Sequence, residues 1–203
     1  MPVQAQPFQG FPLALSRPIF SRSFLHALPR FHMRDRVATL IRGRRERLTR
    51  ALKHPLAQPV AVGTPLTDEA RQHLFGEAED LYWNELEWEH LTEEEATEGV
   101  PLSELTFPGL LAFVRGLLLT EVNPDALAPA EPRPQVVDDI LGFLTGRVVE
   151  LEERLSNPAA DDDPAQLRTE FDTTDRLIDL VLYQYHGLNS DQIERLEMTK
   201  SPE

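Results

Sequence analysis

The sequence contains no cysteine among its 203 residues. A chain without cysteine forms no disulfide, no thiolate zinc site and no iron–sulfur cluster, and it has no cysteine nucleophile. Long apolar runs are also missing, because the longest, 107–119, contains Arg115 and is shorter than the roughly 20 apolar residues that span a bilayer. We therefore expect a soluble, cytoplasmic protein with no membrane contact.

Patterns that carry chemistry are missing as well. The sequence has no glycine-rich phosphate loop and no Gly-x-Ser-x-Gly nucleophile elbow. Glu87 and His90 have the Glu-x-x-His spacing of a di-iron bundle, but the second pair that such a site needs is missing, and a solvated acidic face explains them better. The acidic run 161–163 is too contiguous for a calcium loop. We predict no enzyme, no metal site and no cofactor.

Charge is unevenly distributed along the chain. The formal net charge is −14, yet residues 1–53 hold eleven Lys or Arg against two acids, whereas residues 54–203 hold nine against 32. An acidic body repels nucleic acid and anionic membrane, while a basic segment attracts either of them or folds back onto its own body. The sequence leaves these alternatives open.

Residues 1–32 differ in composition from the rest of the chain. They contain no acid, three arginines, five phenylalanines and five prolines, and they show no helical or strand period. We interpret this segment as a disordered arm or as a mis-assigned start, with Met33 as the true first residue. A targeting peptide, which is also rich in Arg and poor in acids, is the third alternative.

Residues 33–203 read as a single all-α domain. Leucine, with 31 residues, outnumbers valine and isoleucine, and no segment alternates with a period of two. The pattern predicts a basic helix within 33–54, central helices within 67–122, and a C-terminal hairpin with a terminal turn within 134–198. The expected long helices are 34–53, 68–90, 106–122, 135–155 and 164–186, with Thr67, Asp163 and Ser190 as caps and Gly187 as a stop.

The last two long helices have matched apolar seams. Their seam residues recur at spacings of three and four, which is the repeat of packed helices. A short polar connector joins them, so we predict an antiparallel helical hairpin, with coiled-coil packing, inside a helical bundle. The seams consist of Val137, Leu141, Leu144, Val148, Leu151 and Leu155, and of Leu167, Phe171, Thr174, Ile178, Val181 and Tyr185.

The basic helix 34–53 is the polar feature with a recognisable mechanism. Guanidinium groups suit the geometry of phosphate, and five arginines surround this helix. The same residues also fit docking onto an acidic helix such as 68–95 of the same chain. Arg44 falls within the apolar stripe of the helix. The candidates for phosphate or partner contact are Arg42, Arg44, Arg45, Arg47 and Arg50.

The C-terminal stretch 178–197 resembles the tail of large adenine-specific DNA methylases of bifunctional restriction–modification systems. The residues that match the pattern are Ile178, Asp179, Leu182, Tyr183, Gly187, Leu188, Ile193 and Glu197, whereas His186 and Asn189 depart from it. The family's catalytic Asn-Pro-Pro-aromatic signature and its glycine-rich cofactor loop are missing here. The resemblance implies a helical terminal piece without the methylase's catalytic part.

Two functional hypotheses follow. The first is a non-catalytic helical protein-interaction module, an accessory or remnant of a DNA methylation or restriction system, with an unidentified protein partner or a second copy of itself. The second is a nucleic-acid-binding module that acts through residues 34–53.

Overall fold

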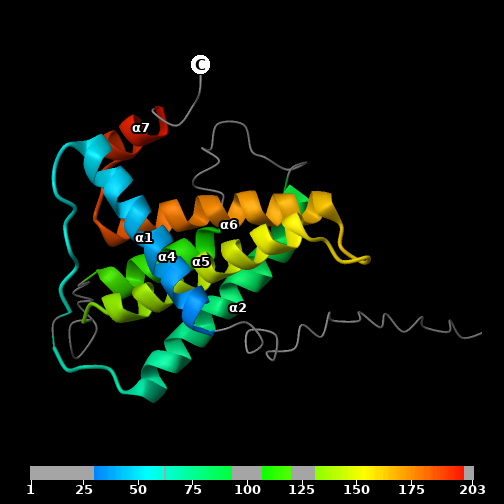
Figure 1. The fold of residues 1–203 in the computed structure, drawn as a ribbon. Helices are drawn as coiled ribbons and strands as arrows, with labels where there is room; N and C mark the ends of the chain where they lie inside the picture. The colour runs from blue at the N-terminus through cyan, green and yellow to red at the C-terminus, as the bar shows by residue number, and fades with distance from the viewer. Residues whose placement is uncertain (1–29, 62, 93–106, 120–130, 199–203) are drawn as a thin grey trace, which may run out of the picture.

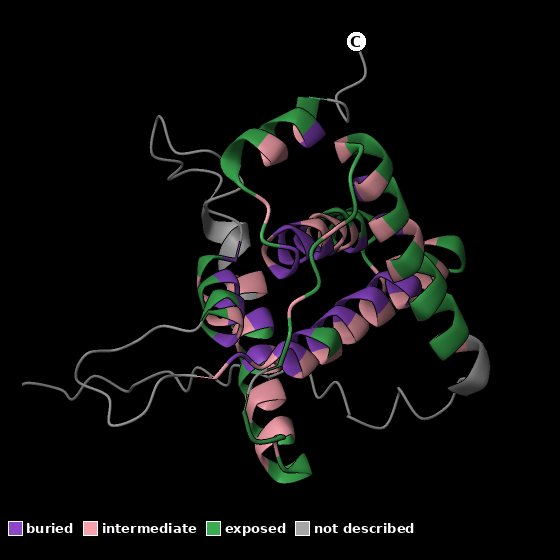
Figure 2. Ribbon diagram, turned by 90° about the vertical axis from the view of Figure 1, so that its left-hand side faces the viewer, coloured by how far each residue is buried: buried purple, intermediate pink, exposed green. Residues whose placement is uncertain are grey.

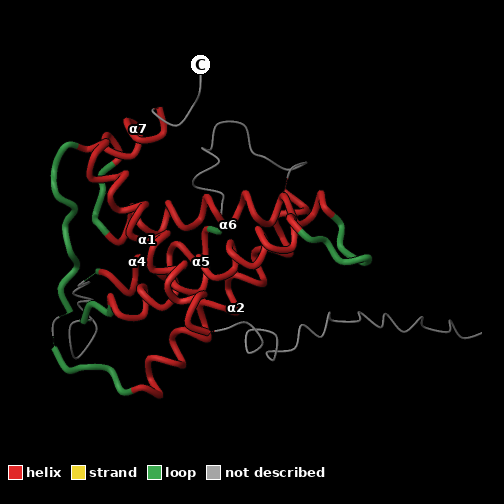
Figure 3. The backbone as a smooth tube through the Cα atoms, in the orientation of Figure 1, coloured by secondary structure: helices red, strands yellow, loops and turns green. Residues whose placement is uncertain are grey.

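The structure is a computed structural model that describes residues 30–61, 63–92, 107–119 and 131–198, without the side chains of 30–32 and 87–92. Within these ranges the regular elements are helices, and no strand occurs among them (Figure 3). The helices are α1 Arg30–Leu52, α2 Asp68–Thr92, α4 Pro108–Leu118, α5 Pro134–Ser156, α6 Pro164–Tyr185 and α7 Ser190–Met198. The predicted all-α bundle is confirmed. The predicted arm lies outside the described residues, apart from the first turn of α1.

The expected helix boundaries agree with the observed ones to within four residues. Thr67 Oγ1 accepts a hydrogen bond from the backbone N–H of Ala70 at 3.2 Å, and Asp163 Oδ1 accepts one from Ala165 at 2.9 Å, so both expected caps are present. Ser190 is not the cap of α7. Asn189 and Gln192 exchange two side-chain-to-backbone hydrogen bonds, at 2.9 and 3.0 Å, in a reciprocal capping box.

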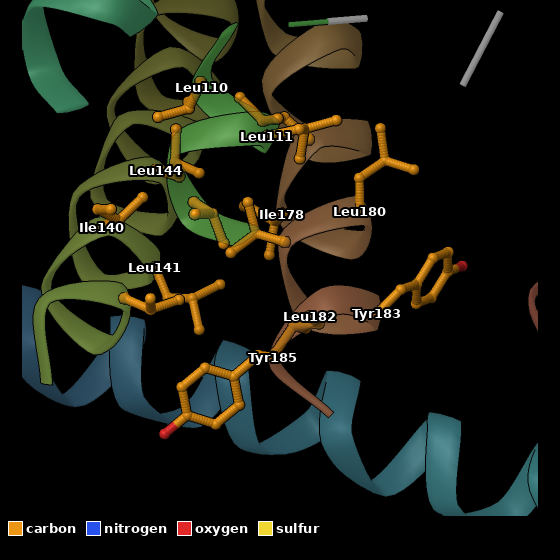
Figure 4. Packing of buried hydrophobic residues seen from close by; sticks show 14 of the residues in the cluster. Leu110, Leu111, Ile140, Leu141, Leu144, Ile178, Leu180, Leu182, Tyr183 and Tyr185 are labelled. Carbon is orange, nitrogen blue, oxygen red and sulfur yellow. The ribbon is translucent and has the colours of Figure 1, made fainter. Parts of the chain in front are cut away.

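Helices α5 and α6 form the antiparallel hairpin that the seams predict, and they lie side by side through the centre of the bundle (Figure 1). Ten of the twelve predicted seam residues are buried, while Leu155 and Phe171, near the connector, are half-buried. Figure 4 shows the leucine and isoleucine side chains of α4, α5 and α6 meeting between the helices. This core is the support on which α1 rests.

Helix α4 follows a residue with a left-handed backbone conformation, and an acid from another helix caps its first turn. Phe107 precedes the helix with a φ of 52°, and Pro108 opens it. The Glu85 carboxylate of α2 accepts hydrogen bonds from the N–H groups of Gly109 and Leu110 at 2.6 and 2.9 Å. A carboxylate at this position satisfies two free backbone donors and complements the helix dipole. The cap comes from another helix, so local sequence patterns do not reveal it.

Helix α2 contacts the hairpin through an aromatic cluster. The buried Tyr82 ring stacks on Phe107 with centroids 5.4 Å apart and meets Phe143 of α5 edge-on at 5.3 Å. Its hydroxyl lies 2.8 Å from Thr174 Oγ1, a polar seam position of α6. The cluster leaves Trp83 beside Phe143 with 38% of its surface exposed. Trp83 therefore stands at the border between the core and the outer surface.

Helix α6 ends as the sequence predicts. Gly187 has a φ of 61°, a conformation that costs glycine little. The N–H of Leu188 donates to the Tyr183 carbonyl at 2.9 Å, and the N–H of Gly187 donates to the Gln184 carbonyl at 3.0 Å. These two hydrogen bonds form a Schellman motif. The turn directs α7 back toward the C-terminal end of α1 (Figure 1).

Candidate functional site

Helix α1 carries the five candidate arginines and crosses the hairpin over α5 (Figure 1). Leu48 is buried in the core, and Ile41 and Leu52 pack against it. These residues share one face of the helix because they recur at helical spacing. The opposite face of α1 is exposed to solvent (Figure 2). The five arginines therefore divide according to the side on which they lie.

Arg44 lies on the buried side, with only 8% of its surface exposed. Its Nη1 donates to Asp179 Oδ1 at 2.7 Å and to the Asp175 backbone oxygen at 3.2 Å, and its Nη2 pairs with the Asp175 carboxylate. Burial opposes the charge of Arg44, but the two carboxylates outweigh it and raise the pKa of Arg44 above its ordinary value. Arg44 is thus a structural residue and is not available to a phosphate.

Arg45 is held less tightly. Its Nη2 lies 3.4 Å from Asp138 Oδ1, and its guanidinium carbon lies 5.0 Å from the centroid of the Tyr185 ring. The Tyr185 hydroxyl donates to the other Asp138 oxygen at 3.1 Å, and Figure 4 shows its ring pointing toward α1. Burial, reinforced by Asp138, raises the pKa of Tyr185 to about 12. Tyr185 therefore stays neutral and bridges α6, α5 and α1.

The other three candidates lie on the exposed side of α1. Arg42, Arg47 and Arg50 are exposed, and within the described part of the chain none of them pairs with an acid. Arg50 has a local contact, from its Nε to the Glu46 carbonyl at 3.4 Å. Of the five nominated arginines, these three are the ones that the described part of the chain leaves open to an external ligand.

Of the alternatives left open for the basic helix, contact with an acidic surface of its own chain describes Arg36, Arg44 and Arg45. The ion pairs of α1 in the described residues run to α5 and α6, and none of them runs to residues 68–86, the part of the suggested partner whose side chains are described. Besides the pairs of Arg44 and Arg45, Arg36 contacts Glu152 and Glu153 at 3.0 and 2.6 Å. Composition alone did not discriminate between acidic helices, because a helix's acid content does not determine which neighbour its fold brings close.

A groove of about 1160 Å³ opens between α1 and α5, and we call it the α1–α5 groove. Its surface is mostly apolar, and α2 and the connector after α1 complete its walls. Its lining residues are Met33, Arg34, Val37, Ala38, Ile41, Arg42, Arg45, Glu46, Thr49 and Arg50 of α1, Pro55, Leu56 and Gln58 of the connector, Trp83 of α2, and Asp138, Gly142, Phe143, Gly146, Arg147 and Glu150 of α5.

Two glycines of α5 contribute to the depth of the groove. A Cβ atom at Gly142 or Gly146 would meet nothing within 4 Å, so each glycine exposes helix backbone to the open space. Phe143 lies between them in sequence, and Trp83 stands beside it with the Arg147 guanidinium 5.2 Å from its ring. Sequence analysis missed this site. The available signal was the Gly142–Gly146 spacing of four residues, which puts both on one helix face away from the seam.

Some charged residues along the groove have an oppositely charged partner in the described residues, and others do not. Asp138 pairs with Arg45, and Glu150 pairs with Arg147 at 2.9 Å. Arg147 also pairs with Glu170 at 2.5 Å; burial opposes its charge, but these acids raise the pKa of Arg147. The arginines along the α1 edge that have no acidic partner in the described residues are Arg34, Arg42 and Arg50, while Glu46 is the exposed acid among them.

The residues that carry the methylase-like pattern build the corner between α6 and α7. Ile178 and Leu182 are fully buried, and the Tyr183 hydroxyl donates to Glu197 Oε1 at 2.6 Å. Asp179 is the partner of Arg44, and Arg176 Nη1 lies 2.7 Å from Glu197 Oε2. The polar residues of the pattern therefore have structural roles in this chain. Tyr183 and Glu197 hold α7 against α6, and Asp179 holds α1 against α6.

No group of three or more His, Asp or Glu side chains able to hold a metal ion occurs among the described residues, and the side chains of Glu87 and His90 lie outside them. No helix in the described part of the chain is long and apolar enough to cross a membrane.

Comparison with known proteins identifies no relative of this chain. No family model matches the chain, and no match is found among curated proteins or among solved structures.

Proposed function

We propose that this protein is a non-catalytic, cytoplasmic protein-interaction module and that the α1–α5 groove is its binding surface. The groove itself carries this proposal. Its volume of about 1160 Å³ exceeds the roughly 300–1,000 Å³ of most small-molecule pockets, and it is open and mostly apolar.

The shape of the groove suits a helix of a partner protein. Its lining runs from Met33 to Arg50 on α1 and from Asp138 to Glu150 on α5. At a rise of 1.5 Å per residue these stretches are about 25 and 18 Å long, which accommodates three to four helical turns. Apolar helix faces bind in such grooves through residues spaced three and four apart.

The resemblance of the tail suggests where this partner is found. Residues 178–197 resemble the end of a DNA methylase, and in this chain they form the corner that fixes α1 and hence one wall of the groove. We propose an accessory or remnant of a DNA methylation or restriction system, with a methylase or restriction subunit as the partner. A second copy of this chain is the other candidate.

Site-specific photo-crosslinking in the producing cells tests the proposal. A photoreactive amino acid replaces Ala38, an exposed residue of the groove, and Ala112, an exposed residue of α4, serves as the matched control. We expect a protein crosslink from position 38 but not from position 112. A crosslink to another copy of this chain would identify a homo-oligomer. If position 38 gave no crosslink to any protein, the proposal would be contradicted.

Filling the groove provides the second half of the test. Gly146→Leu projects into free space in the groove, whereas Gly116→Leu adds the same side chain on α4, where a Cβ also meets nothing within 4 Å. Both variants should fold. We expect the crosslink from Ala38 to disappear in Gly146→Leu and to persist in Gly116→Leu.

The exposed face of α1 favours a second candidate function, which is nucleic-acid binding. Arg42, Arg47 and Arg50 are free of acidic partners in the described residues and suit phosphate contacts. The test is a salt titration of DNA or RNA binding, in which affinity must fall steeply with salt. Arg47 lies outside the groove, so Arg47→Ala should weaken nucleic-acid binding but leave the binding of a helix in the groove unchanged.

A further inference from the structure

We propose that the occupant of the α1–α5 groove is an acidic amphipathic helix, with its carboxylates along α1 and its apolar side chains against α5 and Trp83. This inference rests on the proposed function, and it specifies the chemistry of the partner. Its evidence is the arrangement of charge around the groove.

The acids of the groove are mostly neutralised within the protein. Asp138 is engaged by Arg45 and by the Tyr185 hydroxyl, and Glu150 is engaged by Arg147. Neither has to attract a cation from a partner. The groove therefore offers little to a basic helix.

Three arginines on the α1 edge, unlike these acids, have no ion-pair partner in the described residues. Arg34, Arg42 and Arg50 line the groove, are exposed, and have no acidic partner in the described ranges, and Glu46 is the exposed acid among them. They recur every eight residues, which corresponds to about 12 Å along the helix axis. Each arginine also lies about 80° further around α1 than the one before it, so neighbouring arginines of this set meet carboxylates two turns, about 11 Å, apart on a helix that follows the groove around α1.

The apolar part of the groove lies between this edge and α5. Val37 and Ile41 of α1 line it together with Phe143 of α5 and Trp83 of α2. Gly142 and Gly146 allow a helix backbone or a large side chain to approach α5 closely. An occupant thus needs apolar residues on one face and acids beside them, which defines an acidic amphipathic helix.

The net charge of −14 opposes such a partner at long range. At physiological salt the Debye length is about 8 Å, so charges on the far side of the molecule are screened while groups in contact are not. The arginine edge therefore determines which helix binds. The preference for acidic helices should decrease as salt increases.

Designed peptides test this inference directly. The probes are two 18-residue helical peptides with the same leucine stripe, one with glutamates flanking the stripe and one with lysines in their place. Calorimetry gives their affinities, and the fluorescence of Trp83 in a Trp88→Phe protein locates the binding, because Trp88 is the only other tryptophan. We expect the glutamate peptide to bind about tenfold more tightly at low salt, as three exposed ion pairs allow.

Charge reversal on the protein separates the local effect from net charge. The triple variant Arg34→Glu, Arg42→Glu, Arg50→Glu should reverse the preference so that the lysine peptide binds more tightly. The control is Arg47→Glu, Arg115→Glu, Arg195→Glu, which changes the net charge equally at exposed positions outside the groove. It should preserve the preference for the glutamate peptide.

The outcomes are distinct. Equal binding of both peptides, lost in Gly146→Leu but not in Gly116→Leu, would overturn the acidic occupant and leave the interaction module intact. A preference that both triple variants abolish equally would also overturn it, because net charge would then explain the effect. Failure of both peptides to bind would overturn it as well, and the crosslink from Ala38 would then decide separately whether the groove binds a protein.

Discussion

Arg44 on α1 and Asp179 on α6 lie 135 residues apart in the sequence, and their Nη1 and Oδ1 atoms lie 2.7 Å apart. Asp175 completes the arrangement from one turn earlier on α6. A charge on the apolar side of a helix is costly unless its partners are positioned to receive it. The pair therefore fixes the position of α1 on the bundle, and with it one wall of the groove.

The contribution of this ion pair can be measured through its acids. The double variant Asp175→Asn, Asp179→Asn leaves Arg44 buried without a counter-charge, and we expect it to lower the free energy of unfolding by about 3–5 kcal/mol. Arg44→Met, which removes the charge and retains an apolar stem, should cost less. Urea unfolding measures both. An equal cost for the two variants would mean that the lost contacts, rather than the unpaired charge, dominate.

Stability should depend on pH through His186. This residue is buried, with its Nδ1 2.6 Å from the Ala57 carbonyl of the connector. Burial lowers the pKa of His186 below its ordinary value of 6.5, although the contact with Ala57 opposes this effect. The unfolded chain thus binds a proton at a higher pH than the folded protein does, so the free energy of unfolding decreases as pH falls below about 6.5.

Urea unfolding between pH 7.5 and 5 tests this dependence. In His186→Asn the decrease over this range should be smaller than in the original protein. His73→Gln, at an exposed position of α2, removes one histidine elsewhere and serves as the control. If the two variants show the same slope against pH, His186 is not responsible.

Two glycines should respond to alanine in opposite directions. Gly142→Ala places a Cβ in free space within α5, and we expect it to stabilise the protein by about 0.5–1 kcal/mol because alanine is the better helix former. Gly187→Ala occurs at a φ of 61°, so it should destabilise the protein by about 1 kcal/mol. Thermal and urea unfolding measure both, and the same sign for both would contradict the assigned backbone conformations.

The hydrogen bond from Tyr183 to Glu197 should control the opening of α7. Tyr183→Phe removes the donor at 2.6 Å, and we expect a local loss of about 1 kcal/mol, or roughly fivefold faster hydrogen exchange of the α7 amides. Tyr185→Phe removes a hydroxyl that bonds to Asp138 instead. It should leave exchange in α7 unchanged. Faster exchange throughout α5 in Tyr183→Phe would indicate global rather than local destabilisation.

The sequence alone specifies most of the helices and several of their ends. Apolar periodicity, the caps Thr67 and Asp163, and Gly187 as a stop are local signals, because each acts within a few residues of its own helix. It also determined that α5 and α6 pair, since their seams match in length and rhythm. The unusual position of Arg44 in an apolar stripe was visible in the same way.

The contacts of the basic helix depend on how the helices pack in three dimensions. Many acids were available to Arg44, and its partners proved to be Asp175 and Asp179. The Glu85 cap of α4 and the groove beside Gly142 likewise depend on segments far apart in the chain. Contacts of this kind follow from how helices pack as rigid units, and the pattern of one helix does not identify which residue of another helix it will meet. The basic segment identified from composition, helix α1, thus has two faces: one forms ion pairs with α5 and α6, and the other is exposed.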